Sequence, residues 1–299
     1  METKKIGIIG TGHSSFAVAD QLIKKGIKPT IVDIGTNYGG NVKVNEINKI
    51  PRNSWGRECF SSFNAIANNP TELLESFGFG GLSRVWGGAI SKPLNEDVKD
   101  WNLDVSTLND YFKDLDSILT QIGSNDEFSK KYNLKNLDSE IKYNKKRLKT
   151  LGVSRILVNS ENRKTAFNTQ SFFQSKIKSE KIDYLQNKKV IKIEEYNSGI
   201  KCFTSTDELK FDRIFLATGV LSTAKIMLNS IVGLDEINIK ENKLIVSVWK
   251  KKGKCDNLEN FNNGRFASYF FKESKIYNQI YFLNEEILKE IFYPYLSNS

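Results

Sequence analysis

The 299-residue sequence contains one histidine, three cysteines and no run of about 18 apolar residues. Cys59, Cys202 and Cys255 are far apart and form no C-x-x-C pair, so they indicate neither a disulfide framework nor a metal site. Because no apolar run is long enough for a transmembrane helix, we expect no membrane span. A stretch that predicts a strand begins almost at the first residue and leaves no room for a signal peptide, so we expect a cytoplasmic protein.

Basic residues outnumber acidic residues by 44 to 35, which gives a net charge of +9. A basic protein can bind nucleic acid, but these lysines are spread along the chain, and we expect no nucleic-acid partner. We interpret the one dense run, residues 142–149, as the solvated face of a helix. A hydrophobic content of 39% and a charged content of 26% are typical of a soluble globular protein with one large or two modest domains.

Residues 5–35 predict, in order, a buried strand, a tight turn, a helix and a second strand. The turn runs from Gly10 to Ser15, and the helix that follows has apolar residues at helical spacing and ends at Gly26. This order of elements is typical of a dinucleotide-binding unit. The alternative interpretation is an ordinary glycine turn in an α/β protein.

The residue types in this turn suit a phosphate-bearing ligand. Gly10 allows the turn, and Gly12 lets backbone N–H groups approach a pyrophosphate at the positive end of the helix. Asp33 ends the second strand, where a carboxylate can bind a ribose hydroxyl. Ser15 takes the place of the third glycine of G-x-G-x-x-G, a position that a small residue can fill. Further candidates in the turn and after the acid are His13, Ser14, Ile34 and Gly40.

A second glycine-rich stretch, residues 77–101, contains two Gly-Gly pairs that flank Ser83 and Trp86. Glycine at this density destabilises an ordinary helix or strand, and it suits a backbone that must come close to a planar ligand. The alternative is a glycine-rich loop with a packing tryptophan.

This stretch resembles the G-G-L-S-x-V-W-G-G loop of the glucose-methanol-choline (GMC) oxidoreductases, in particular a bacterial branch associated with surface-polysaccharide synthesis. The resemblance implies that FAD is the cofactor and that the loop lies along the flavin. It also implies an oxidoreductase that acts on the CH–OH group of a sugar or another alcohol. The matching residues are Gly80, Gly81, Leu82, Ser83, Val85, Trp86, Gly87 and Gly88, followed by Asp100 and Trp101.

A third informative stretch lies in the second half of the chain. Residues 186–195 and 212–216 predict strands, and Ser222 is expected to cap a helix over residues 223–228. The second of these strands and its helix resemble a stretch that flavoproteins carry after a nucleotide-binding strand. Together with the first glycine turn, they would bracket one FAD site. The residues expected near the cofactor are Val190, whose backbone the resemblance places beside the adenine, and Ala217, Thr218 and Gly219.

We therefore predict an α/β protein with a Rossmann-like FAD-binding domain and a partial substrate domain built on a mixed β-sheet. The FAD-binding domain is expected to comprise residues 1–123 and 182–232, and the insertion and substrate domain to comprise residues 124–181 and 233–299. The other predicted elements are a helix over residues 108–122 with a buried apolar stripe that includes Tyr111, strands over residues 244–249, 266–271 and 276–283, and a helix over residues 285–291.

GMC enzymes place a catalytic histidine near the flavin, after the substrate domain. The only histidine here, His13, lies in the phosphate turn, so we name no catalytic residue and expect the enzyme to be incomplete as a single chain. The main alternative is a non-catalytic flavin- or nucleotide-binding protein, or one half of a split flavoenzyme whose partner chain supplies the missing segment. An NAD dehydrogenase is a further alternative.

Overall fold

The protein is described by a computed structural model. It describes residues 4–35, 76–84, 86, 88–90, 98, 105–118, 121–122, 141–143, 146–153, 155–157, 167–197, 199–239, 265–271 and 276–282. The chain divides into two compact units, Met1–Val85 with Asn168–Trp249 and Trp86–Phe167 with Lys250–Ser299, and each unit is described by itself.

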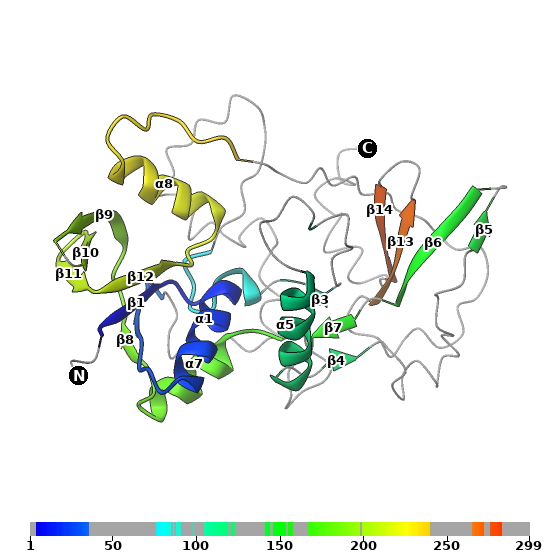
Figure 1. Ribbon diagram of the computed structural model, residues 1–299, viewed down its shortest axis with the longest axis horizontal. Coiled ribbons are helices and arrows are strands. Elements are labelled where there is room, and N and C mark those ends of the chain that lie inside the picture. The colour runs from blue at the N-terminus through cyan, green and yellow to red at the C-terminus, as the bar shows by residue number, and fades with distance from the viewer. Residues whose placement is uncertain are drawn as a thin grey trace, which may run out of the picture. The chain divides into compact units, whose positions relative to one another are not determined.

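The first unit is built on a parallel sheet with the strand order β12-β1-β2-β8 (Figure 1). Its strands are β1 (Ile6–Ile9), β2 (Thr30–Val32), β8 (Asp183–Leu185) and β12 (Arg213–Leu216). The two central strands are apolar and fully buried, as in parallel sheets that are covered on both faces. All four strands run in the same direction, so their carboxyl ends share one edge.

Three helices of this unit adjoin the sheet in sequence. Helix α1 (His13–Lys24) connects β1 to β2, α7 (Gln170–Lys178) precedes β8, and α8 (Val220–Ser230) follows β12. On α1, Phe16 and Ala19 are buried, and Gly26 takes a φ of +73° just after the helix ends. The strand-turn-helix-strand unit expected from residues 5–35 is therefore confirmed.

An antiparallel sheet lies between β8 and β12 in the sequence, with the strand order β11-β10-β9. Its strands are β9 (Val190–Tyr196), β10 (Gly199–Thr204) and β11 (Glu208–Phe211). One hydrophobic cluster joins the two sheets and α8, with Ile9 and Val32 from the parallel sheet, Cys202 and Phe211 from the antiparallel sheet, and Ile226 from α8. The antiparallel sheet thus covers part of the parallel sheet.

The described part of the second unit contains one helix and two small antiparallel sheets. The helix is α5 (Val105–Ile118), and the sheets have the orders β14-β13-β6-β5 and β3-β7-β4. The strands expected over residues 266–271 and 276–283 are confirmed. The strands are β3 (Ala89–Ile90), β4 (Gln121–Ile122), β5 (Ile141–Tyr143), β6 (Lys146–Val153), β7 (Arg155–Leu157), β13 (Arg265–Phe271) and β14 (Ile276–Phe282).

Four sequence-based expectations are wrong in detail. The helix expected over residues 108–122 is α5, which ends at Ile118, and Gln121–Ile122 form strand β4, which pairs with β7. The described residues of 142–149 lie in strands β5 and β6 and not in a helix, because these two strands pair with each other and β6 also pairs with β13. Tyr111 on α5 is 56% exposed and is no core residue. Helix α8 begins at Val220, so Ser222 lies inside its first turn and does not cap it. The strand over residues 244–249 and the helix over residues 285–291 lie outside the described residues.

The expected fold class is confirmed: the protein is α/β, with a Rossmann-like parallel sheet and separate antiparallel sheets. The first unit also includes α7, which precedes residues 182–232, the range expected to form the second segment of the FAD-binding domain. The expected division into an FAD-binding domain and a substrate domain stays a prediction.

Candidate functional site

Gly10 lies at the carboxyl end of β1, between the ends of two neighbouring strands. Its N–H donates to the Val32 carbonyl oxygen at 2.9 Å. Its φ is +103°, and a Cβ atom at this position would lie 2.7 Å from the Ala217 carbonyl oxygen. Both the backbone conformation and the closeness of β12 therefore require glycine at this position.

Gly12 is the N-cap residue of α1 and meets a different requirement. Its φ of −75° is accessible to any residue, and no described atom lies within 4 Å of a Cβ atom built on it. Among the described residues, no side-chain hydrogen bond caps the helix at Gly12, and the positive end of a helix favours an anion. The open space that a Cβ atom would enter fits a phosphate group next to the backbone.

Two further glycine-bearing segments meet this turn. The 3-10 turn η2 (Gly81–Arg84) touches it directly, because a Cβ atom at Gly81 would lie 3.6 Å from the Gly12 Cα atom. Residues 217–219 reach it from β12, where the Ala217 N–H donates to the Ile9 carbonyl oxygen at 3.0 Å. Gly219 has a φ of +79° and turns the chain from β12 into α8. Segments that are distant in the sequence thus converge at the carboxyl edge of the parallel sheet.

Thr11, between the two glycines, joins the first turn to both Asp33 and the second glycine-rich stretch. Its hydroxyl donates to the Asp33 Oδ2 atom at 2.7 Å. The same hydroxyl oxygen accepts the Gly80 N–H at 2.8 Å. Thr11 is 3% exposed, so these hydrogen bonds are shielded from water. Thr11 was not among the residues predicted from the sequence, although a hydroxyl residue inside G-x-G, followed by an acid at the next strand end, is a signal for this contact.

Thr169, the residue before α7, completes the same arrangement. Its hydroxyl donates to the Thr11 carbonyl oxygen at 2.6 Å, and its N–H donates to the Ser83 Oγ atom at 3.1 Å. The Ser83 hydroxyl in turn donates to the Gly80 carbonyl oxygen at 2.6 Å. We refer to Thr11, Ser83 and Thr169 as the hydroxyl network. Thr169 had no sequence signal, because it lies 158 residues from its partner Thr11.

Asp33 follows β2 and is 9% exposed. Burial raises the pKa of its carboxyl group to about 6, although hydrogen bonds from Thr11, from Tyr184 and from the Ile34 and Gly35 N–H groups oppose this rise. The Tyr184 hydroxyl lies 3.4 Å from the same Oδ2 atom that Thr11 contacts. The protein therefore supplies several donors to Asp33, and contact with a ribose stays a prediction.

The first turn of α1 carries the three other candidates of this segment. Burial lowers the pKa of His13, so its imidazole is neutral at pH 7. Ser14 is exposed. Ser15 is fully buried, as expected for the third position of the glycine motif, and its hydroxyl has no hydrogen-bond partner among the described residues. Because Ser15 is completely buried, a larger side chain at this position of α1 would have no room.

The remaining candidates lie in different surroundings. Leu82 is 37% exposed on η2, and Thr218 contacts the Thr223 hydroxyl at 2.9 Å. Val190 is 7% exposed and belongs to the hydrophobic cluster, so only its backbone is available for the predicted adenine contact. The Trp86 indole N–H donates to the Phe167 carbonyl oxygen, and both residues belong to the second unit. The candidates outside the described residues are Gly40 and Gly87.

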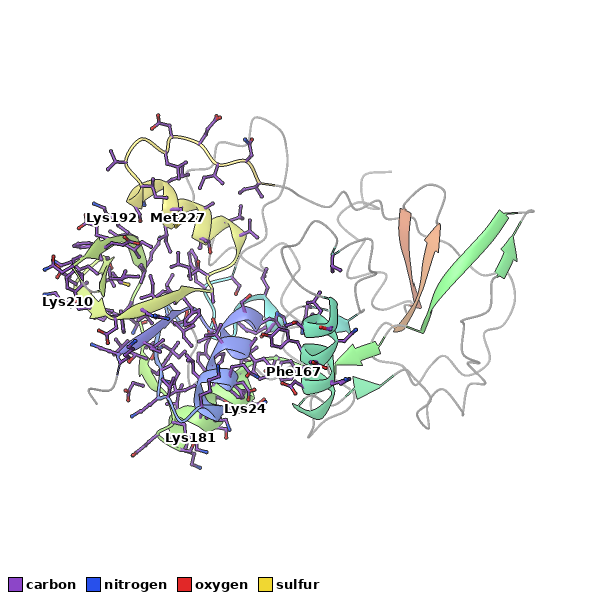
Figure 2. All side chains as sticks on the ribbon, in the orientation of Figure 1. Lys24, Phe167, Lys181, Lys192, Lys210 and Met227 are labelled. Atoms are coloured by element: carbon purple, nitrogen blue, oxygen red, sulfur yellow. The ribbon has the colours of Figure 1, made fainter. Side chains whose placement is uncertain are left out.

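Other kinds of site lack support in the described part of the chain. The residues that the structure describes contain no group of three or more histidine, cysteine or acidic side chains that could hold a metal ion. No helix among them is both long and apolar enough to cross a membrane. Figure 2 labels Lys24 on α1, Lys181 after α7, and Lys192 and Lys210 on the antiparallel sheet, so the basic side chains are spread over several elements.

Comparisons with known proteins give weak similarities. No protein-family model and no curated protein matches the sequence. Solved structures that resemble it include the bacillithiol disulfide reductase Bdr from Staphylococcus aureus (11% identity, TM-score 0.27, 73% of this chain and 39% of that chain). An L-amino acid deaminase from Proteus vulgaris also resembles it (10% identity, TM-score 0.30, 77% of this chain and 50% of that chain). So does a glycine oxidase from Bacillus cereus (15% identity, TM-score 0.29, 75% of this chain and 58% of that chain). The chain thus spans 39% to 58% of the length of these proteins, and similarities this weak carry no argument about its function.

Proposed function

We propose that this protein binds FAD and is an FAD-dependent oxidoreductase of the GMC type that is incomplete as a single chain. The observation that carries the proposal is that three glycine-bearing segments converge at the carboxyl edge of the parallel sheet, where a Cβ atom at Gly12 would meet no described atom within 4 Å. A phosphate-binding turn at the carboxyl edge of a parallel sheet is where α/β proteins of this class hold dinucleotides. The resemblance of residues 80–88 to the GMC loop is the reason for choosing FAD over NAD.

Each segment has a role in this proposal. The Gly12 and Gly81 backbones lie in contact, and the pyrophosphate binds on the open side of Gly12, where a Cβ atom would meet no described atom within 4 Å. Asp33 accepts hydrogen bonds from the adenosine ribose in addition to that from Thr11. The turn at Gly219 lets β12 end close to the cofactor without a Cβ atom in the way. Bound FAD would supply the redox chemistry, which is the acceptance of a hydride from a substrate C–H bond.

The substrate proposed is a small molecule with a CH–OH group, such as a sugar or another alcohol. Oxidation of an alcohol requires a base that takes the hydroxyl proton. Burial lowers the pKa of His13, and a neutral imidazole can accept a proton. His13 is, however, the first residue of α1, where we expect the phosphates of the cofactor and not its flavin ring. We assign no catalytic residue to the described part of the chain.

The absence of a further histidine in the sequence favours a second candidate function, a flavin-binding protein that is not catalytic by itself. In this form the protein binds FAD through the same turn, and a partner chain supplies the base. The two candidates share the cofactor and differ in turnover.

Calorimetric titration of cofactor-free protein with FAD, and separately with NAD, tests the proposal. We expect FAD to bind more tightly than NAD, because FAD engages the loop that begins at Gly80 as well as the phosphate turn. Tighter binding of NAD would overturn the flavin assignment and leave a nicotinamide-dependent enzyme.

A further inference from the structure

Thr169 occupies the N-cap position of α7 but does not cap this helix. A threonine at an N-cap usually accepts an N–H bond from the first helical turn. Thr169 makes no such bond, and its φ and ψ of −81° and −9° are those of a helical residue. The Asn168 Oδ1 atom accepts the Gln170 N–H at 3.1 Å instead. The Thr169 hydroxyl is thus directed to a partner outside its own helix.

Its nearest partner, at 2.6 Å, is the carbonyl oxygen of Thr11, which belongs to the peptide group between Thr11 and Gly12. The same hydroxyl also lies 3.0 Å from the Ser83 Oγ atom and 3.4 Å from the Gly80 carbonyl oxygen. A trans peptide is planar, and its C=O and N–H bonds point in opposite directions. The hydrogen bond from Thr169 therefore fixes the direction of the Gly12 N–H as well as that of the carbonyl. A Cβ atom at Gly12 would meet no described atom within 4 Å, so the backbone there is open to a ligand at the start of α1.

Thr169 also holds the second glycine-rich segment. Its N–H donates to the Ser83 Oγ atom, and Ser83 donates to the Gly80 carbonyl oxygen. The Gly80 N–H returns to the Thr11 hydroxyl, so the contacts form a closed ring between the two glycine turns. Thr169 is 0% exposed and Ser83 is 2% exposed, so water cannot replace these bonds when one of them is lost.

We propose that Thr169 is a positioning residue for the cofactor: it orients the Thr11–Gly12 peptide and holds η2 against it. Thr169 acts through the two glycine turns and does not itself touch the ligand. The inference rests on the proposed dinucleotide function, because FAD is the probe that reports on the geometry of the turns.

The test measures the FAD affinity and the visible absorption spectrum of bound FAD in Thr169→Val and Thr169→Ser. Valine keeps the shape of threonine and removes the hydroxyl, so we expect FAD affinity to fall about tenfold and the flavin absorption band to change shape. Serine keeps the hydroxyl, so we expect it to restore both the affinity and the band shape of the wild type. A role confined to packing would give the opposite order, because serine loses the methyl group that valine keeps.

Thr204→Val is the matched control. Thr204 is 7% exposed, and its hydroxyl is held in the turn before β11, where it accepts the Asp207 N–H at 2.9 Å. We expect this variant to lose thermal stability in the cofactor-free state and to keep wild-type FAD affinity. Equal losses of affinity in Thr204→Val and Thr169→Val would overturn the inference, since any buried hydroxyl would then have the same effect.

A second variant covers the case in which Thr169→Val does not fold. Ser83→Ala removes the hydroxyl that links Thr169 to Gly80, and we expect a several-fold loss of FAD affinity in folded protein. Wild-type affinity in Ser83→Ala, or in a folded Thr169→Val, overturns the positioning role while the proposed function stands. Failure of the wild-type protein to bind FAD overturns both.

Discussion

At the scale of single residues, Asp33 shows how the site balances opposing effects. Burial raises the pKa of its carboxyl group to about 6, and the donors around it, led by the Thr11 hydroxyl, limit this rise. A ribose hydroxyl would be a further donor to the same carboxylate. Ligand binding should therefore favour the charged form of Asp33 and lower its pKa.

The raised pKa of Asp33 predicts that its ionisation destabilises the cofactor-free protein. The folded state binds this proton more tightly than the unfolded state, in which the pKa is near 3.8. The contribution to stability is therefore complete below about pH 4 and is lost as the pH rises through about 6. A shift of this size corresponds to about 3 kcal/mol.

Asp33→Asn removes this ionisation and keeps an acceptor for the Thr11 hydroxyl. Urea unfolding of the wild type and the variant between pH 4 and pH 7 measures the difference. We expect the wild type to lose up to about 3 kcal/mol relative to the variant over this interval. A difference that does not change with pH would mean that Asp33 titrates as an ordinary exposed carboxyl group.

At the scale of elements, aromatic contacts attach α7 to the rest of the first unit. Phe172 on α7 meets Phe16 on α1 with ring centroids 4.7 Å apart and an angle of 82° between the rings. Phe173 meets Phe79 at 6.2 Å, and Phe79 in turn meets Tyr184 on β8 at 5.4 Å. These ring contacts join α7 to α1, to β8 and to Phe79, which precedes η2. Because Thr169 immediately precedes α7, this packing also determines where the hydroxyl network lies.

Phe173→Ala should therefore weaken both the fold and the cofactor site. Phe173 is 0% exposed, and removing a buried phenyl ring typically costs about 3–5 kcal/mol of unfolding free energy. Urea unfolding of the cofactor-free protein measures this loss. Phe215→Ala is the control, since Phe215 is 39% exposed on β12 and its removal should cost much less. Similar losses in both variants would mean that α7 is not anchored through Phe173.

The same elements show what sequence can and cannot predict. The first glycine turn and Asp33 were predictable, because their geometry depends on a strand, a turn and a helix that are adjacent in sequence. The strands in residues 142–149 were not, because their lysine-rich sequence lacks the apolar alternation of a strand and is held by pairing: β5 with β6 locally, and the end of β6, from Lys149, with β13 more than 100 residues away. The start of α8 at Val220 depends on the positive φ of Gly219, which a search for a capping serine overlooks.

The contacts of the hydroxyl network were also not predictable from the sequence. Thr169 is one of many threonines that precede helices, and local rules assign such a residue to capping. Only the folded chain shows that its hydroxyl contacts Thr11 instead. Long-range pairing of two ordinary residues leaves no pattern in a single sequence.

At the scale of the whole molecule, the residues expected to bind the cofactor are present, but no residue is assigned as the catalytic base. The 299-residue sequence has one histidine, and it lies at the start of α1. A positioned base typically contributes about 10²–10⁴-fold to proton removal. The chain is therefore expected to bind FAD without the group that alcohol oxidation requires.

This expectation predicts little turnover by the 299-residue chain loaded with FAD. The measurement is anaerobic bleaching of the bound flavin by a panel of sugars and simple alcohols. We expect slow bleaching or none with every member of the panel. Rapid bleaching by any of them would identify a base elsewhere in the chain and would remove the non-catalytic alternative.

The proposed function requires that the cofactor pyrophosphate binds in the open space at Gly12. The most direct measurement is the visible absorption of bound FAD in the wild type and in Gly12→Val. Both proteins are first incubated with FAD, and the unbound FAD is then removed. The backbone at Gly12 accepts any residue, and no described atom obstructs a Cβ atom there, so the variant should fold with wild-type unfolding behaviour. We predict a flavin spectrum in the wild type and none in the variant. A folded Gly12→Val protein that retains bound FAD would contradict the account.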